Sequence, residues 1–464
     1  MNDNPTPSVL LLNAQQRLAD ADLDGAELLI DTHLERHPAD ATALRLRGLV
    51  RGQRGQWQSA EADFAAAAAM TPRDPQIAVG RAQILARQGR ADVALAALDG
   101  FLALVPGQID ALASRSQILQ HLGRADEAVA TAQVAVAFNR QSARAQLVFG
   151  TALIKAGRAR EAIEVLERAV ALEPEVIDGW VNLGVAQRDC GNLEGAEATY
   201  RKALALSDAD PVIHNNLGNV LSGLGRADDA AAAYRQALRM RPGYVDARVN
   251  LANALRTGND PTAALALIDA APEEHQSHPG LLNAKGNALR AAERYDEAIS
   301  VLKRAVELAP DNAEFCNNLG LALAVKNRLE DAEPLFRKAA ALKPDHAVIS
   351  NNHGALLLRL FRFEAAIVAL ANATARDPAY DEAHCNQAVA HYMLGQSDQA
   401  IAIYRRVLAR NPRDGFARYG LAVTLLENQQ LAEAETEVRS VIADDPGNAM
   451  AHNTLGVLML EQVP

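Results

Sequence analysis

The sequence is poor in the residues that several common functions require. Only 4% of its 464 residues are aromatic, which leaves few side chains to stack on nucleic-acid bases. The formal net charge is -11, so the chain as a whole repels phosphate backbones and anionic lipid. No run of about 18 apolar residues is present that would cross a bilayer. We therefore expect no nucleic-acid partner and no membrane insertion.

Cysteine is also scarce. Cys190, Cys316 and Cys385 are scattered and odd in number, which is typical of a reducing compartment and not of a disulfide framework. The first residues lack the basic and apolar regions of a secretory signal. These observations favour a cytoplasmic protein. Arginine outnumbers lysine 39 to 7, which is typical of a GC-rich bacterial genome.

Motifs that carry chemistry are missing as well. No glycine-rich phosphate loop follows a strand pattern, and no histidine or cysteine pair has metal-ligand spacing. His384 and His391 lie seven residues apart, and we expect them to be structural. The sequence therefore predicts no catalytic residue, no metal and no cofactor, so that the chain is not an enzyme by itself.

A repeat of 34 residues runs through the whole chain instead. A small residue returns at this interval without insertion or deletion. We call this residue the small position of each repeat. It is occupied by Ala14, Gly48, Ala82, Ser116, Gly150, Gly184, Gly218, Ala252, Gly286, Gly320, Gly354, Ala388, Ala422 and Gly456.

Two further columns share this register. Twelve residues after each of the first thirteen small positions stands an alanine, and twenty-four residues after them a proline is common. Small side chains allow two helices to approach closely, and proline ends the second helix. The alanines are Ala26, Ala60, Ala94, Ala128, Ala162, Ala196, Ala230, Ala264, Ala298, Ala332, Ala366, Ala400 and Ala434. The prolines are Pro38, Pro72, Pro106, Pro174, Pro242, Pro310, Pro344, Pro378, Pro412 and Pro446.

Each repeat is thus predicted to be a hairpin of a helix A and a helix B. One such hairpin buries too little surface to be stable, so hairpins must stack. The columns resemble the tetratricopeptide repeat. The segment NNLGNVLSGLGRADDAAAAYRQALRMRPGYVDARVNLANALR is similar to the regular arrays of that family, including the repeat half of O-linked N-acetylglucosamine transferases. The resemblance implies an all-α, right-handed α-solenoid of helix-turn-helix units.

We expect residues 1–464 to form a single solenoid. Thirteen full repeats span about residues 7–448, and a lone helix follows at 449–464. The repeat at 245–278 is irregular, because Pro261 should open its helix B and Pro272 should shorten it. The apolar residues of 449–464 form a poor cap. We expect this end either to pack on something else, which includes self-association, or to continue into a longer parent chain.

Asparagines form the first candidate site. They stand two residues before the small position, and in three repeats also one residue after it. The resemblance implies that these positions face a concave groove, where amides pair with the backbone of an extended peptide. The candidate peptide-binding residues are Asn182, Asn216, Asn219, Asn250, Asn253, Asn287, Asn318, Asn352 and Asn386. Asparagine is also common at such positions without a binding role.

Arginines form the second candidate site. Arg47, Arg81 and Arg115 each stand directly before a small position. Three stacked guanidinium groups would select an acidic ligand through bidentate pairing. Better repeats carry leucine there, so the same arginines are also compatible with a packing role for their stems.

Two functions remain from these observations. The first is a protein-protein interaction scaffold whose concave groove binds an extended peptide segment of a partner protein. The alternative is the substrate-recruiting region of a glycosyltransferase or sulfotransferase, whose catalytic domain lies beyond Pro464 or on another chain.

Overall fold

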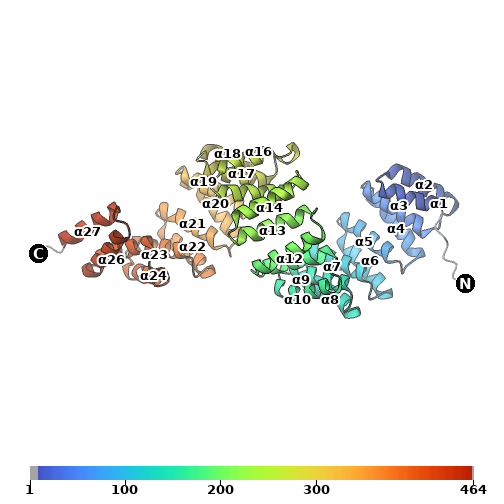
Figure 1. The fold of residues 1–464 in the computed structure, drawn as a ribbon, viewed down its shortest axis with the longest axis horizontal. Coiled ribbons are helices and arrows are strands. Elements are labelled where there is room, and N and C mark those ends of the chain that lie inside the picture. Colours follow the sequence, from blue (N-terminus) through green and yellow to red (C-terminus); the bar gives the residue numbers. More distant parts are fainter. Residues whose placement is uncertain (1–8, 462–464) are drawn as a thin grey trace. The chain divides into compact units, whose positions relative to one another are not determined.

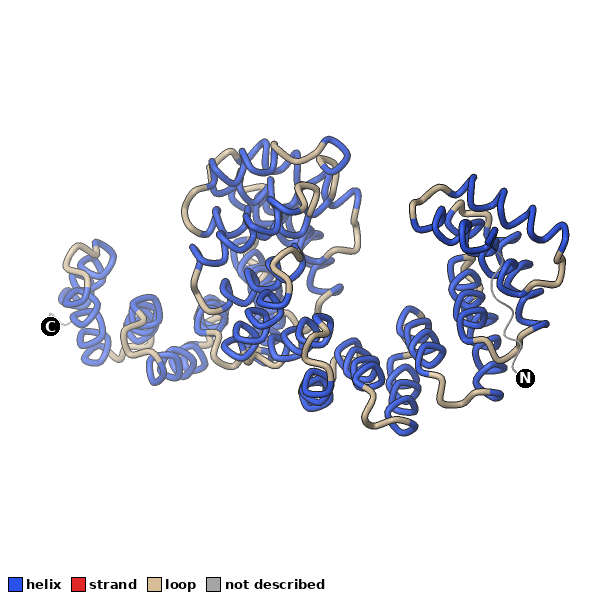
Figure 2. The backbone as a smooth tube through the Cα atoms, turned by 45° about the vertical axis from the view of Figure 1, so that its right-hand side comes forward, coloured by secondary structure: helices blue, strands red, loops and turns tan. Residues whose placement is uncertain are grey.

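The computed structural model describes residues 9–461. Within them it contains 27 α-helices, one short 3-10 helix and no strand. The tube of Figure 2 shows helices joined by loops throughout this range. The predicted all-α solenoid is confirmed. The chain divides into two compact units, Met1–Met240 and Arg241–Pro464. A single solenoid over the whole chain stays a prediction. The ends of its predicted range, residues 1–8 and 462–464, lie outside the described residues.

The first unit consists of helices that follow one another in pairs (Figure 1). They are α1 Val9–Ala19, α2 Leu23–Arg36, α3 Ala41–Gln53, α4 Trp57–Met70, α5 Pro75–Arg87, α6 Ala91–Leu104, α7 Ile109–His121, α8 Ala125–Phe138, α9 Ala143–Lys155, α10 Ala159–Leu172, α11 Ile177–Asp189, α12 Leu193–Leu206, α13 Pro211–Gly223 and α14 Ala227–Met240.

The second unit continues the same alternation of helix A and helix B. Its helices are α15 Val245–Thr257, α16 Pro261–Asp269, η1 Glu273–His275, α17 Pro279–Ala291, α18 Tyr295–Leu308, α19 Ala313–Val325, α20 Leu329–Leu342, α21 Ala347–Arg359, α22 Phe363–Arg376, α23 Asp381–Met393, α24 Ser397–Arg410, α25 Gly415–Glu427, α26 Leu431–Asp444 and α27 Ala449–Glu461.

The crossing of helix A and helix B lies where the two small columns meet. All thirteen alanines of the column, from Ala26 to Ala434, have no exposed surface. At the facing small position, a methyl group added to Gly218 would lie 2.5 Å from Cε1 of Tyr234. Glycine at this position therefore leaves room for a bulky side chain of helix B, and the two helices pack closely.

The turn between helix A and helix B has a fixed backbone conformation. Seven residues after the small position, φ is positive, at 74° in Gly225 and at 57° in Phe361. This left-handed conformation ends helix A and favours glycine. It recurs at the same place in each full repeat of the described chain, including repeats that lack glycine there.

The turn from helix B to the next helix A is closed by a second recurring contact. Trp180 Nε1 donates to the carbonyl oxygen of Pro174 at 2.8 Å, and Nε2 of His384 lies 3.1 Å from that of Pro378. Both side chains stand four residues before a small position and six residues after the proline. His384 thus satisfies a turn carbonyl, while His391 bonds Gln396 instead.

The irregular repeat has a shortened helix B. Pro261 is the first residue of α16, as the sequence predicted, and α16 has nine residues where α14 has fourteen. Pro272 follows its end and precedes η1. As a result, the neighbouring helices A, α15 and α17, pack directly on each other. Pro334 lies inside α20, which continues to Leu342.

The last described helix has no helix B beside its small position. A methyl group added to Gly456 would meet no atom within 4 Å. Leu458 is buried, whereas Met450 is 64% and Leu460 is 76% exposed. The predicted packing of this end on another surface, including self-association, stays a prediction.

We expect Ala230→Leu to destabilise the protein by about 1–3 kcal/mol, because the added carbons enter a crossing that has no exposed surface. Ala232→Leu, two residues further on the exposed side of α14, is the matched control and should change the free energy of unfolding by less than about 0.5 kcal/mol. Urea unfolding followed by circular dichroism measures both. Equal losses of stability in the two variants would show that the crossing at Ala230 is not tightly packed.

Candidate functional site

Six asparagines of the second unit form an amide ladder that joins successive helices A. Nδ2 of Asn318 donates to Oδ1 of Asn283 at 2.9 Å. Asn352 donates to Asn317 at 2.9 Å, and Asn386 donates to Asn351 at 3.0 Å. In each pair the donor stands two residues before its small position, and the acceptor three residues before that of the preceding repeat. The ladder thus links α17, α19, α21 and α23.

Half of this ladder was not predicted from the sequence. Asn283, Asn317 and Asn351 are not among the predicted peptide-binding residues, although they accept hydrogen bonds from residues that are. The signal was present in the dipeptides Asn317–Asn318 and Asn351–Asn352. Asn351 also donates to Tyr380 Oη at 3.1 Å and to Glu382 Oε1 at 3.0 Å, which fixes its amide further.

Other predicted asparagines have different environments. Asn182 is half-buried and donates to the carbonyl oxygen of Asp178 in its own helix at 2.9 Å. Asn219 accepts a hydrogen bond from Tyr234 Oη at 2.8 Å. Asn287 is buried, and its Oδ1 has no hydrogen-bond partner. Half-buried positions are occupied by Asn216, Asn250 and Asn253. The predicted set is therefore not one uniform row of solvent-facing amides.

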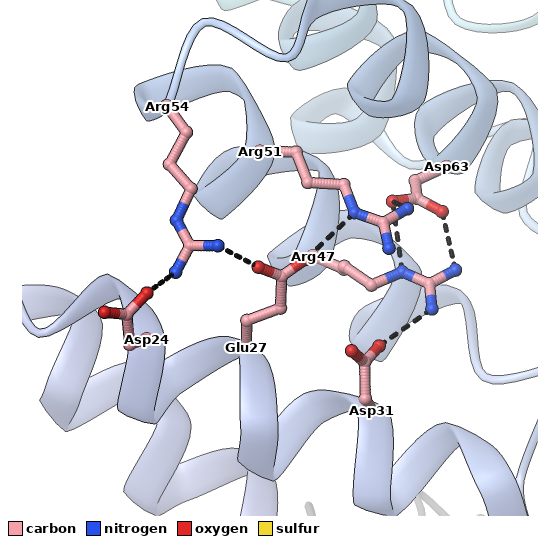
Figure 3. Close-up of polar contacts among 7 residues, drawn as sticks. All are labelled: Asp24, Glu27, Asp31, Arg47, Arg51, Arg54 and Asp63. Atoms are coloured by element: carbon pink, nitrogen blue, oxygen red, sulfur yellow. Dashed lines mark hydrogen bonds and ion pairs between the residues drawn. The ribbon is translucent and has the colours of Figure 1, made fainter.

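The three predicted arginines are paired with carboxylates of helices B. Arg47 bonds Asp63 through Nε at 3.1 Å and Nη2 at 2.7 Å, and it also bonds Asp31 at 2.9 Å (Figure 3). Arg81 donates twice to Glu61, at 3.2 and 2.9 Å.

Arg115 completes the same stripe. It donates to Asp99 at 2.7 Å and also to the hydroxyl of Thr131. An acidic ligand at Arg47, Arg81 and Arg115 would have to displace these partners. The stripe is therefore a weaker candidate for ligand binding than the amide ladder.

A larger ion-pair network surrounds Arg47 in the first two repeats. Arg51 bonds Asp63 at 2.8 Å and Glu27 at 3.1 Å, and Arg54 contacts Glu27 and Asp24 (Figure 3). Hydrogen bonds that Arg47 donates to Asp63, and to a lesser degree to Asp31, raise the pKa of its guanidinium. The network joins α2, α3 and α4, so its charges stabilise the stacking of hairpins.

Two kinds of feature are absent from the described part of the chain. Between residues 9 and 461, no three side chains of histidine, cysteine, aspartate or glutamate come together in a group that could hold a metal ion. Nor is any helix of that range long and apolar enough to cross a membrane. Cys316 and Cys385 are buried free thiols, and burial raises the pKa of Cys385 to about 12.

Stacked helical hairpins with hydrogen-bonded amides along the helices A define a helical repeat protein. Models described as the tetratricopeptide repeat match residues 48–109, 81–143, 147–211, 215–279, 283–347, 357–415 and 395–458. The chain therefore belongs to the tetratricopeptide repeat family. Its repeat architecture is that of a protein-interaction scaffold and is typical of proteins without catalysis.

Solved structures support the fold and no more than the fold. The crystal structure of the APC/C hetero-tetramer Cut9-Hcn1 contains a similar chain, with a TM-score of 0.53 at 14% sequence identity. The similarity covers 97% of this chain and 95% of that chain. In all, 478 solved chains match, so the architecture alone does not identify a partner. No curated protein matches the sequence.

We expect Asn318→Ala to destabilise the protein by about 1–3 kcal/mol, because it removes a buried inter-helix bond and leaves Oδ1 of Asn283 without that donor. Asn182→Ala, at the same register but with a hydrogen bond only to its own helix, should cost less than about 0.5 kcal/mol. Chemical denaturation of both variants checks the difference. A stable Asn318→Ala protein would show that the ladder contributes nothing to stacking.

We expect Asp63→Asn to destabilise the first unit by about 1–3 kcal/mol. Its carboxylate is 6% exposed and neutralises both Arg47 and Arg51, whose charges would lose their common partner. Asp31→Asn is the control, since Asp31 is 45% exposed and bonds Arg47 alone, and it should cost less than about 1 kcal/mol. Thermal unfolding at low and high salt measures both, and equal shifts would contradict the ranking.

Proposed function

We propose that one face of the second unit, the amide face, binds an extended segment of a partner protein. It consists of the amide ladder together with Asn253 and Asn287. The observation that carries the proposal is the amide ladder itself, because it lines up six amide groups on consecutive helices A. Family membership supports the proposal, since scaffolds of stacked helical hairpins present such faces to partners.

The ladder keeps hydrogen-bonding capacity after its internal bonds are made. A carboxamide has two N–H donors and an oxygen with two lone pairs. Asn352 and Asn386 each use one N–H on the preceding helix. Asn287, one residue after the small position of α17, has a buried oxygen without a partner. Donors and acceptors therefore stand together, as the backbone of an extended chain requires.

The spacing of the helices also suits an extended segment. Neighbouring packed helices lie about 8–10 Å apart, and an extended chain advances about 3.3 Å per residue. One repeat therefore corresponds to about three residues of a bound segment. Amides that recognise the backbone would hold segments of many sequences, which fits a scaffold better than a selective pocket.

Both functions predicted from the sequence need the same groove. A stand-alone scaffold holds its partner there, and a recruiting region of a glycosyltransferase or sulfotransferase holds its substrate there. The proposal therefore concerns the binding step that the two share.

We expect the double variant Asn253→Ala and Asn287→Ala to weaken the binding of extended peptides by about tenfold or more. Each lost bond to a peptide backbone is worth about 0.5–1.5 kcal/mol. Asn253 is half-buried and Asn287 has an unpartnered oxygen, so thermal stability should stay nearly unchanged. Fluorescence anisotropy with peptides selected from a random display library measures the affinity.

Asn182→Ala is the matched control, because Asn182 bonds only its own helix and lies in the first unit. It should leave the affinity unchanged. The proposal fails if the library yields no binding peptide, or if the Asn253 and Asn287 variant binds every selected peptide as well as the wild-type protein does.

A further inference from the structure

Two half-buried arginines of the second unit combine an unpartnered guanidinium nitrogen with the lack of an acidic partner. Arg256 and Arg290 stand four residues after the small positions of α15 and α17, two helices that pack on each other. Both are half-buried, and neither forms an ion pair with any described residue. Nε of each guanidinium is buried and has no hydrogen-bond partner.

This pair differs from the three arginines that stand directly before small positions. Arg47, Arg81 and Arg115 are all neutralised by carboxylates of helices B. Lys285, next to the small position of α17, is paired with Asp269 at 2.6 Å. Arg256 and Arg290 are therefore positive charges that the described chain leaves uncompensated.

The pair lies on the same face as the amide ladder. Asn283, Asn287 and Arg290 are at positions i, i+4 and i+7 of α17, which places them along one side of the helix. Asn283 accepts the ladder bond from Asn318, so that side is the one turned toward the ladder. Asn253 and Arg256 repeat the arrangement on α15.

The local electrostatics are unfavourable without a counter-charge. Burial, and after it the positive charge of Arg256, lowers the pKa of the Arg290 guanidinium. Two neighbouring like charges that are partly removed from water destabilise the fold. Such an arrangement is typical of positions where a ligand supplies the missing charge.

We propose that Arg256 and Arg290 bind the carboxylate of an aspartate or glutamate side chain in the segment held by the amide face. Guanidinium groups match a carboxylate in a planar, bidentate geometry. The unpartnered oxygen of Asn287 requires an N–H donor, which a peptide backbone carries and a sulfate ion lacks. The charge pair and the amide acceptor thus favour an acidic protein segment over a free anion.

This inference rests on the proposed function and adds to it a requirement for an acidic residue. The wild-type full chain is challenged with a display library of random peptides about ten residues long, which span about three repeats. An aspartate or glutamate should be enriched at one position of the selected peptides. Exchanging that residue for its amide should weaken binding about ten- to hundredfold in anisotropy measurements.

The double variant Arg256→Gln and Arg290→Gln should abolish both the enrichment and the difference between acid and amide. Arg406→Gln with Arg413→Gln is the matched control, since it changes the net charge equally at exposed arginines of the same unit and should bind like wild type. The Arg256 and Arg290 variant should unfold at the same temperature as wild type or higher, because a repulsion is removed.

The outcomes separate the two proposals. If no peptide binds, the proposed function fails. If peptides bind through Asn253 and Asn287 but show no preference for an acid, only the role of Arg256 and Arg290 is overturned. A further outcome also overturns that role. If sulfate stabilises the wild-type protein but not the Arg256 and Arg290 variant, and the selected peptides show no preference for an acidic residue, the pair is a free-anion site. If the Arg256 and Arg290 variant unfolds at a lower temperature than the wild-type protein, the two arginines stabilise the fold, and this too overturns their role in binding.

Discussion

The close crossing of two helices at small side chains is the constraint on which the rest of the structure depends. The alanine of helix B that stands twelve residues after the small position has no exposed surface in any of the thirteen repeats. Glycine or another small residue faces it on helix A in the full repeats. A hairpin packed in this way still leaves apolar surface on its sides. Stacking covers that surface, so each repeat depends on its neighbours for stability.

The same register that builds the core also decides which polar residues meet. Side chains two and three residues before the small position reach across to the neighbouring helix A, as in Asn318 with Asn283. Side chains directly before it reach helix B, as in Arg47 with Asp63. Because the repeat is 34 residues long throughout, residues at the same register position in successive repeats lie beside one another in the structure. No further sequence motif is needed to bring them together.

The two kinds of row have different consequences for binding. Carboxylate and guanidinium groups in the first repeats satisfy each other and hold hairpins together. Among the ladder amides, Asn352 and Asn386 are half-buried and keep hydrogen-bonding capacity after their bonds to the preceding helix. Arg256 and Arg290 stand apart from both kinds, because their charges have no counterpart among the described side chains and so gain most from an acidic partner.

The sequence by itself determined the helical hairpins, their crossing and the start of α16 at Pro261, because small side chains and proline act through local geometry. It also indicated the asparagine columns. Only the tertiary structure decided which partners these polar groups bond. Asn318 bonds a buried amide of the preceding repeat, and Arg47 bonds two carboxylates. Arg256 and Arg290 bond no carboxylate. Pairing between polar side chains depends on distances between helices whose residues lie about 34 positions apart in the sequence. The spacing of residues along the chain does not determine these distances.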